Sequence, residues 1–210
     1  KVDRDDGEGS YFVSPFPGTY SDRQIRIVFE DPEGQDLHPK QKAYISSYFT
    51  DFEAALYGDD FTDQSLGYRR YVDLKSVIDY FILCELGHNV DAYRLSTFFY
   101  KDRNSIDSTF HFGPLWDFNL AYGNVDYNTA VQSPTNAFGN PAGGWLYKDF
   151  RMFWFPKLMS DPNFQNKMKT RWDSLRDDEL SNTRITFLID SMAASLEESQ
   201  VRNYERWPIL

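Results

Sequence analysis

The stretch from residue 73 to residue 87 constrains the fold of this 210-residue chain more than any other, because it predicts a helix that is apolar over much of its circumference. Asp73 is a suitable N-cap residue and Gly87 a suitable stop signal. The apolar positions between them are Leu74, Val77, Ile78, Phe81, Ile82 and Leu86. A helix that is apolar around most of its circumference has to be buried. We therefore expect a central helix over 74–86, with the rest of the domain packed around it.

A loop and a hairpin are predicted directly after this helix. Residues 95–100 and 109–115 are rich in aromatic and aliphatic side chains, and the polar residues between them are typical of a turn. Asp91 lies in the loop before the first strand, and Asp117 follows the second strand. The segment 85–124 is therefore expected to present two carboxylates on the loops that flank a small hairpin.

Most of the remaining chain is predicted to be helical. We expect helices over 38–57, where Pro39 fits the first turn, and over 162–176, where Asp161 and Pro162 form a start signal. Two further stretches carry helical patterns, namely 144–160 and the stripe after Ser181 made by Ile185, Leu188, Ile189, Met192 and Leu196.

The β content is expected to be small. Residues 24–29 alternate in polarity and are predicted to form a strand, whereas Pro15 and Pro17 favour irregular structure over 11–20. Residues 122–144 are rich in Asn, Gly, Pro and Thr and are expected to form a long connection. The fold class that these patterns predict is α+β, predominantly helical.

The composition excludes several classes of function. The net charge is −10 at pH 7 and no Lys/Arg run forms a basic stripe, so we expect no nucleic-acid partner. No apolar stretch reaches the length of a transmembrane helix. The single cysteine, Cys84, lies in an apolar run and is interpreted as a buried structural thiol. The glycine motifs that bind phosphates, the zinc-site spacings and the serine-hydrolase elbow are all missing.

Asp91 is the first candidate for chemistry. A carboxylate on a loop that a rigid helix holds is well placed to accept a proton from a substrate hydroxyl. The structural alternative is an Asx-turn or a hydrogen bond to nearby backbone N–H groups.

Arg94 is interpreted either as a phosphate ligand or as an ion-pair partner of Asp117. His88 either relays protons or caps the carbonyls at the end of the helix.

Asp117 is the second candidate. Two aromatic residues flank it, and an unpaired charge in such a setting is costly. Mg²⁺ would stabilise that charge, because carboxylate oxygen is a ligand that Mg²⁺ prefers. The alternative is a salt bridge with Arg94. Asn119 is interpreted as a second oxygen ligand or as a turn former. A third possibility treats Asp91 and Asp117 as the carboxylate pair of a hydrolase with a deep cleft.

Several short motifs together resemble one family of proteins over about residues 60–210. They include Asn89-Val90-Asp91, Tyr93-Arg94-Leu95-Ser96, Gly113-Pro114-Leu115-Trp116-Asp117-Phe118-Asn119, Tyr122-Gly123-Asn124 and Arg202-Asn203-Tyr204-Glu205-Arg206-Trp207-Pro208. In these motifs the chain resembles the CotH kinase family, the atypical protein kinases related to spore coat protein H. More narrowly, it resembles the extracellular members found in Bacteroidetes.

The resemblance implies a protein-kinase-like C-terminal lobe, in which the small hairpin presents the catalytic and metal loops. Asp91 would be the catalytic residue, and Asp117 and Asn119 would bind Mg²⁺. The supporting positions would be His88, Asn89, Arg94, Ser96 and Asn124. ATP would be the phosphoryl donor, and a protein Ser or Thr hydroxyl the acceptor. The protein would be secreted or held at the cell surface by a lipoprotein-type anchor.

The chain departs from this pattern in three ways. Ser96 stands where kinases place a metal-binding Asn, and Asn119 replaces the second acid of a W-D-x-D motif. The phosphate-covering loop and strand Lys of a nucleotide-binding lobe have no counterpart before residue 24. We therefore expect residues 1–37 to form a lobe-junction segment and 38–210 to form the helical lobe. The chain is expected to be truncated relative to the full protein and to be inactive in isolation.

The alternative is a non-catalytic, pseudokinase-like surface module that binds carbohydrate or protein. Ser96 and Asn119 favour it, and so does the aromatic content of 18%. Trp145 and Trp154 are its candidate contacts with surface glycans. The same aromatic residues also fit the interior of a globular core.

Overall fold

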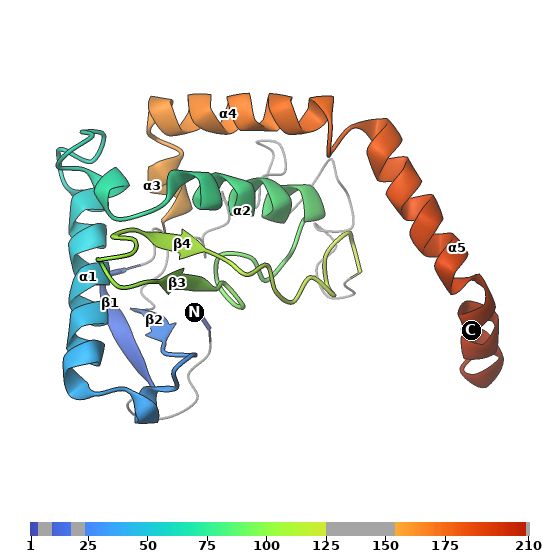
Figure 1. Ribbon diagram of the computed structural model, residues 1–210, viewed down its shortest axis with the longest axis horizontal. Coiled ribbons are helices and arrows are strands. Elements are labelled where there is room, and N and C mark those ends of the chain that lie inside the picture. The colour runs from blue at the N-terminus through green and yellow to red at the C-terminus, as the bar shows by residue number, and fades with distance from the viewer. Residues whose placement is uncertain (4–9, 18–23, 125–153, 209–210) are drawn as a thin grey trace. The chain divides into compact units, whose positions relative to one another are not determined.

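The computed structural model describes residues 1–3, 10–17, 24–124 and 154–208. It combines helices with two small antiparallel hairpins (Figure 1), which confirms the mixed, mainly helical fold class. The chain divides into two compact units, Lys1–Lys167 and Met168–Leu210. The predicted connection over 122–144 and most of the predicted helix over 144–160 lie outside the described residues.

Helix α2, Leu74–Gly87, is the central helix that the apolar pattern predicts. Its N-cap is Asp73, whose carboxylate accepts a hydrogen bond from the backbone N–H of Ser76 at 2.7 Å. Its buried apolar side chains include Val77, Ile78, Phe81 and Ile82. The helix ends differently from the prediction, because Gly87 is still helical and His88 adopts the left-handed conformation, with φ 46°.

Helix α1, Pro39–Tyr57, is also confirmed. The ring of His38 accepts a hydrogen bond from the backbone N–H of Lys40 at 3.2 Å. The side chain of Gln41 accepts one from the backbone N–H of His38 at 2.9 Å, which completes a capping box. The side chains of this helix that are buried are Phe49, Phe52, Glu53 and Leu56.

The first hairpin corrects one prediction. Strand β1, Tyr11–Pro17, pairs antiparallel with strand β2, Gln24–Val28, although its prolines predict irregular structure over 11–20. The register shifts between Val13 and Pro17. In the described part of the chain β1 has β2 as its only strand partner. Prolines are tolerated at such bulges and on such edge strands, which is why the prediction was wrong.

The first residues of the chain join this hairpin to the candidate site. Val2 forms β-bridges with Ile27 of β2 and with Thr97. The backbone N–H of Val2 donates to the carbonyl of Thr97 at 2.8 Å. Thr97 closes the loop that follows α2, so the first hairpin supports that loop from one side.

The second hairpin is confirmed but is shorter than predicted. Strand β3, Phe99–Lys101, pairs antiparallel with strand β4, Phe110–Phe112, as the two arrows in Figure 1 show. Ser96 has φ 49° and Gly113 has φ 132°. A left-handed backbone cannot continue a β-ladder, so each strand is confined to the hairpin side of these residues.

Aromatic side chains fill the core of the first unit. The indole of Trp154 stacks on Phe49, with ring centroids 6.0 Å apart, and meets Phe52 edge-on at 4.8 Å. Phe110 of β4 packs against both phenylalanines. Because Trp154 is 0% exposed, the expectation that it contacts glycans is wrong. Trp145 lies outside the described residues.

Helices α3, Phe155–Leu158, and α4, Pro162–Asp177, follow this core. Helix α4 begins at the predicted start signal. The carboxylate of Asp161 is buried and accepts a hydrogen bond from the backbone N–H of Asn163 at 2.9 Å. It also accepts hydrogen bonds from the Tyr68 hydroxyl, at 2.9 Å, and from the Arg69 guanidinium.

The second unit contains the end of α4 and helix α5, Asn182–Arg206. Ser181 caps α5 as predicted, with its hydroxyl accepting from the backbone N–H of Arg184 at 3.3 Å. No residue of α5 is buried, and its apolar stripe is exposed apart from Ile185, which is partly buried. Among the residues that the structure describes, no helix is long and apolar enough to cross a bilayer.

Candidate functional site

Asn89 anchors the loop that follows α2. It is 3% exposed, and its backbone N–H donates to the carbonyl of Cys84 at 3.2 Å. Its side-chain oxygen accepts a hydrogen bond from the backbone N–H of Asp91 at 3.2 Å. The buried amide therefore sets the backbone direction at Asp91, and the Asx-turn here belongs to Asn89 rather than to Asp91.

The carboxylate of Asp91 is held by Arg94. The Nη2 atom of Arg94 lies 2.6 Å from Oδ1 of Asp91, and Nε of Arg94 donates to the carbonyl of Val90 at 3.0 Å. With one nitrogen on the carboxylate and another on the Val90 carbonyl, the guanidinium fixes the direction of the carboxylate, which stays partly accessible at 18% exposure. The alternative in which Arg94 pairs with Asp117 is wrong. The structure commits Arg94 to Asp91 instead.

Asp117 faces solvent on the neighbouring loop. Its carboxylate accepts a hydrogen bond from the Ser96 hydroxyl at 3.1 Å, and its backbone carbonyl accepts one from the Asn89 amide at 3.4 Å. Two residues of the α2–β3 loop thus hold the position of Asp117. The structure thereby brings together Asn89, Ser96 and Asp117, three of the residues that the motifs single out.

The chain after Asp117 returns to the end of α2. The backbone N–H of Tyr122 donates to the carbonyl of Gly87 at 2.6 Å. A Cβ on Gly87 would lie 3.6 Å from the ring of Phe118 and 3.7 Å from the methyl of Ala121. Sequence analysis read Gly87 only as a stop signal and missed this packing role, because no local pattern relates residue 87 to residues 118–122.

Left-handed backbone is concentrated in this region. In the described part of the chain, the non-glycine residues with positive φ are His88, Tyr93, Ser96, Asp117 and Tyr122, and all of them lie in the segment 85–124. Such conformations are costly and tend to cluster at functional sites, where the surroundings enforce them. The clustering supports the choice of this segment as the candidate site.

The other predicted supporting residues have different surroundings. The side chain of Asn124 donates to the backbone carbonyl of Asn119 at 2.7 Å, so it shapes the loop that carries Asn119. The side chain of Asn119 is exposed. His88 caps α2 through its backbone N–H rather than through its ring. Burial lowers the pKa of His88, and its Nδ1 atom has no hydrogen-bond partner among the described residues.

The loop after α2 rests on a buried pair that sequence analysis missed. The hydroxyl of Tyr93 donates to the carboxylate of Glu85 at 3.0 Å, and Tyr93 is completely buried. The available signal was an acidic residue inside an apolar helix, since a buried carboxylate needs a donor. This hydrogen bond attaches the loop to α2.

The oxygen atoms at Asp117 fit one kind of metal site. Mg²⁺ usually keeps several waters and is held by one or two carboxylates together with phosphate oxygens. Asp117 offers an exposed carboxylate with the Ser96 hydroxyl beside it. Across the described ranges, no group of three or more His, Cys, Asp or Glu residues is placed to hold a metal. The residues therefore fit an ion that arrives with a nucleotide better than one held by protein alone.

Two pockets of the first unit are lined by described residues that include neither aspartate. One has a volume of about 400 Å³ and the other of about 450 Å³. Asp91 is also engaged by Arg94. A carboxylate-pair hydrolase, which needs both acids in one cleft, gains no support from this arrangement.

Comparison with known proteins adds one finding. The model of the CotH kinase protein family matches residues 19–210. No curated protein matches the chain, and no solved structure matches it either.

Proposed function

The chain belongs to the CotH kinase protein family, and we propose that it is the C-terminal lobe of a protein kinase that transfers the γ-phosphoryl group of ATP to Ser or Thr hydroxyls. The observation that carries this proposal is the placement of Asp117. Its exposed carboxylate is held by Ser96, which comes from the same loop as Asp91. A catalytic-loop Asp followed along the chain by a metal-binding Asp is the order that protein kinases have.

In this proposal Asp91 accepts or orients the proton of the acceptor hydroxyl. Arg94 holds one carboxylate oxygen of Asp91 at 2.6 Å, and Asn89 fixes its backbone. Both contacts keep the carboxylate in one orientation, which is what a positioned general base needs. Arg94 is thus a positioning residue, and the proposed phosphate contact from this side chain is not required.

Asp117 would hold Mg²⁺, with Asn119 and Ser96 in support. When bound, Mg²⁺ neutralises charge on the phosphate oxygens. The chain's own part is to keep the Asp117 carboxylate exposed and to stop it from collapsing onto a cation of the protein. The commitment of Arg94 to Asp91 serves this purpose, because it removes the nearest guanidinium in the loop from competition.

The lobe boundaries and the location belong to the same proposal. We assign residues 1–37 to a lobe junction and 38–210 to the helical lobe. The Bacteroidetes-type, extracellular or surface-anchored assignment rests on the sequence resemblance alone. The bridges of Val2 to Ile27 and to Thr97 support a junction role for the first residues, because they join the hairpin to the α2–β3 loop.

The test is phosphoryl transfer by the protein expressed with its native flanking sequence. With Mg²⁺ and radiolabelled ATP, we expect transfer to a protein acceptor that falls at least about 100-fold in Asp117→Ala and in Asp91→Ala. Asp102→Ala, at an exposed position of the β3–β4 turn, is the matched control and should retain activity. Full activity of Asp117→Ala would refute the proposal. Failure of the wild type to bind Mg²⁺-nucleotide would favour the pseudokinase alternative.

A further inference from the structure

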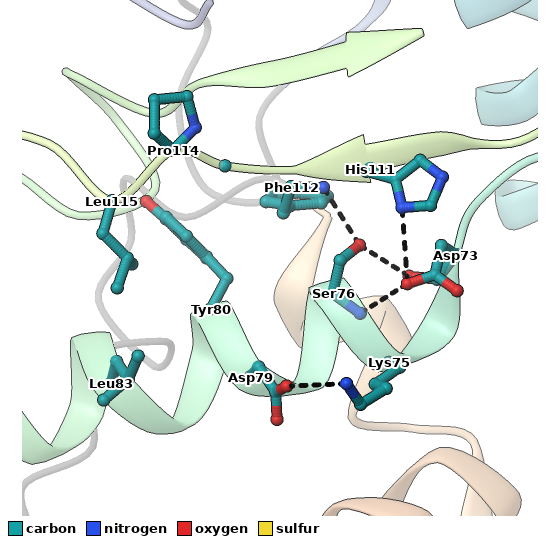
Figure 2. A pocket seen from close by; sticks show the side chains of 11 residues that line it. Asp73, Lys75, Ser76, Asp79, Tyr80, Leu83, His111, Phe112, Pro114 and Leu115 are labelled. Carbon is teal, nitrogen blue, oxygen red and sulfur yellow. Dashed lines mark hydrogen bonds and ion pairs between the residues drawn. The ribbon is translucent and has the colours of Figure 1, made fainter. Parts of the chain in front are cut away.

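The pocket of about 400 Å³ lies between α2 and the chain that leads from β4 to Asp117. Figure 2 shows its lining as a polar end and an apolar end. Asp73, Asp79 and His111 are at the polar side, while Leu83, Pro114 and Leu115 form the apolar side. Both kinds of surface are thus offered within one cavity.

The polar end carries an excess of negative charge. Oδ1 of Asp73 lies 3.6 Å from Nδ1 of His111, and Lys75 lies 3.9 Å from Asp79. The side chain of Lys75 is 74% exposed, and a long, exposed ion pair of this kind contributes little. Asp107, which does not line the pocket, lies 2.8 Å from the other ring nitrogen of His111. A cationic side chain that enters the pocket would meet the carboxylates of Asp73 and Asp79 there, with Lys75 as a competing cation in the lining.

The apolar end offers a surface that suits an aliphatic group. Leu115 is 45% exposed, which is high for a leucine beside a cavity, and Pro114 is also exposed. Leu83 faces them from α2. An aliphatic side chain placed between these residues would remove apolar surface from water on both sides.

The pocket is also close along the chain to the candidate site. Leu115 lines the pocket, and Asp117 is two residues further on. Two residues of extended chain span at most about 7 Å. A peptide in the pocket would therefore contact the short segment that leads directly to Asp117.

We propose that this pocket docks an extended segment of the protein substrate that carries a basic and an aliphatic side chain a few residues apart. The basic group would lie near Asp73 and Asp79, and the aliphatic group between Leu83 and Leu115. This inference rests on the proposed kinase function, since it names the class of substrate. The apolar contact supplies affinity and the carboxylates supply selectivity.

The test uses fluorescein-labelled decapeptides with one Arg and one Leu separated by one to four residues. Binding to the wild-type chain is followed by fluorescence anisotropy without nucleotide, so it does not depend on phosphoryl transfer. We expect at least one spacing to bind, and the same peptide with Glu in place of Arg to bind at least about tenfold more weakly. Raised salt should weaken the binding of the Arg peptide.

Variants decide whether the pocket is the binding site. Asp79→Lys should weaken binding at least about tenfold, whereas Lys75→Glu, which removes the competing cation, should strengthen it. Leu83→Ser tests the apolar end and should also weaken binding. Asp51→Lys makes the same charge change at an exposed position of α1 and should leave binding unchanged. Circular dichroism of each variant verifies the fold.

The proposal is overturned if no spacing binds, as expected if another part of this chain or a second copy fills the pocket. It is also overturned if Asp79→Lys and Lys75→Glu shift affinity in the same direction. Phosphoryl transfer without docking would leave the kinase function standing and reject this pocket. Docking without any phosphoryl transfer would support the pocket as a peptide-binding site and reject the kinase function.

Discussion

At the scale of single residues, the two aspartates of the site differ in what holds them. Asp91 is fixed by a cation, Arg94, whereas Asp117 is fixed by a neutral hydroxyl and remains exposed. Sequence reasoning found both acids but considered Arg94 only as a phosphate ligand or as a partner of Asp117, and missed its ion pair with Asp91. The motif spacing cannot tell which carboxylate a guanidinium reaches, because that depends on the irregular backbone between them.

Ser96 provides a direct test of the metal loop. Ser96→Ala removes the 3.1 Å hydrogen bond to Asp117. We expect Mg²⁺-nucleotide affinity, measured by calorimetry on the protein with its flanking sequence, to fall several-fold. The free energy of unfolding should change by no more than about 1 kcal/mol, because the hydrogen bond is exposed.

Ser96→Asn is the matched variant for this prediction. Asn tolerates the left-handed backbone found here, with φ 49°, and it is the residue that kinases use as a metal ligand at the corresponding place. We expect it to retain or raise the affinity for Mg²⁺-nucleotide. A loss of affinity equal to that of Ser96→Ala would show that residue 96 does not support the metal.

A buried carboxylate outside the site makes stability depend on pH. Glu53 is 1% exposed and accepts hydrogen bonds from the Ser14 hydroxyl and the Trp154 indole, both at 2.8 Å. Burial raises the pKa of Glu53 to about 7. Folding therefore favours the protonated form. The resulting stabilisation is complete below the ordinary pKa of 4.5 and is lost as the pH rises through about 7.

Glu53→Gln should remove this pH dependence. In thermal unfolding, the stability of the wild-type chain relative to that of the variant should fall between about pH 5 and pH 8, by up to roughly 3 kcal/mol. This difference isolates Glu53 from the other groups that titrate over the same range. Glu205→Gln, at an exposed position, is the control and should leave the wild-type slope unchanged. Equal slopes for wild type and Glu53→Gln would contradict the assignment.

At the scale of secondary-structure elements, local signals were sufficient wherever a helix had a cap. Asp73, Asp161 and Ser181 each precede a helix and accept from a backbone N–H in its first turn. The strands were harder to predict. Strand β1 was missed because its prolines are tolerated on an edge with a register shift. The strands of the second hairpin were predicted to be too long, because the side chain of a residue such as Ser96 does not reveal that its backbone is left-handed.

The cap of α2 can be tested by two substitutions. Asp73→Ala removes the hydrogen bond to the backbone N–H of Ser76 and should lower the free energy of unfolding by about 1 kcal/mol. Asp73→Asn keeps an oxygen acceptor and should retain most of the stability. Urea denaturation of both variants measures the difference. Equal losses would mean that the negative charge, rather than the cap, is what stabilises the helix.

At the scale of the whole molecule, one group of aromatic residues forms the core of the first unit. Composition alone left open whether the aromatic residues fill an interior or line a groove. The rings of Phe49, Phe52, Phe110 and Trp154 contact one another away from solvent, whereas Trp116 and Tyr122 beside the candidate site are exposed. The contacts join α1, β4 and the start of α3, and no local pattern could reveal such distant pairings.

Two tryptophans allow a matched test of that core. Trp154→Ala leaves a large cavity and should lower the free energy of unfolding by about 3–5 kcal/mol, or prevent folding. Trp207 is 66% exposed, so Trp207→Ala should change stability by no more than about 0.5 kcal/mol. Trp154→Phe, which preserves most of the volume, should give an intermediate loss. Urea denaturation followed by circular dichroism measures all three.

The contact between Gly87 and the chain after Asp117 affects how precisely the two aspartates are spaced. The loop with Asp91 leaves the end of α2, and the segment that follows Asp117 returns to the same turn through the Tyr122–Gly87 hydrogen bond. A rigid displacement of α2 therefore carries both carboxylates with it, and their separation is insensitive to such a movement. A Cβ at residue 87 would lie in ordinary van der Waals contact with Phe118 and Ala121, whereas a larger side chain would have to displace them and so alter that separation. The turn at Gly87 thus links the two aspartates without touching either of them.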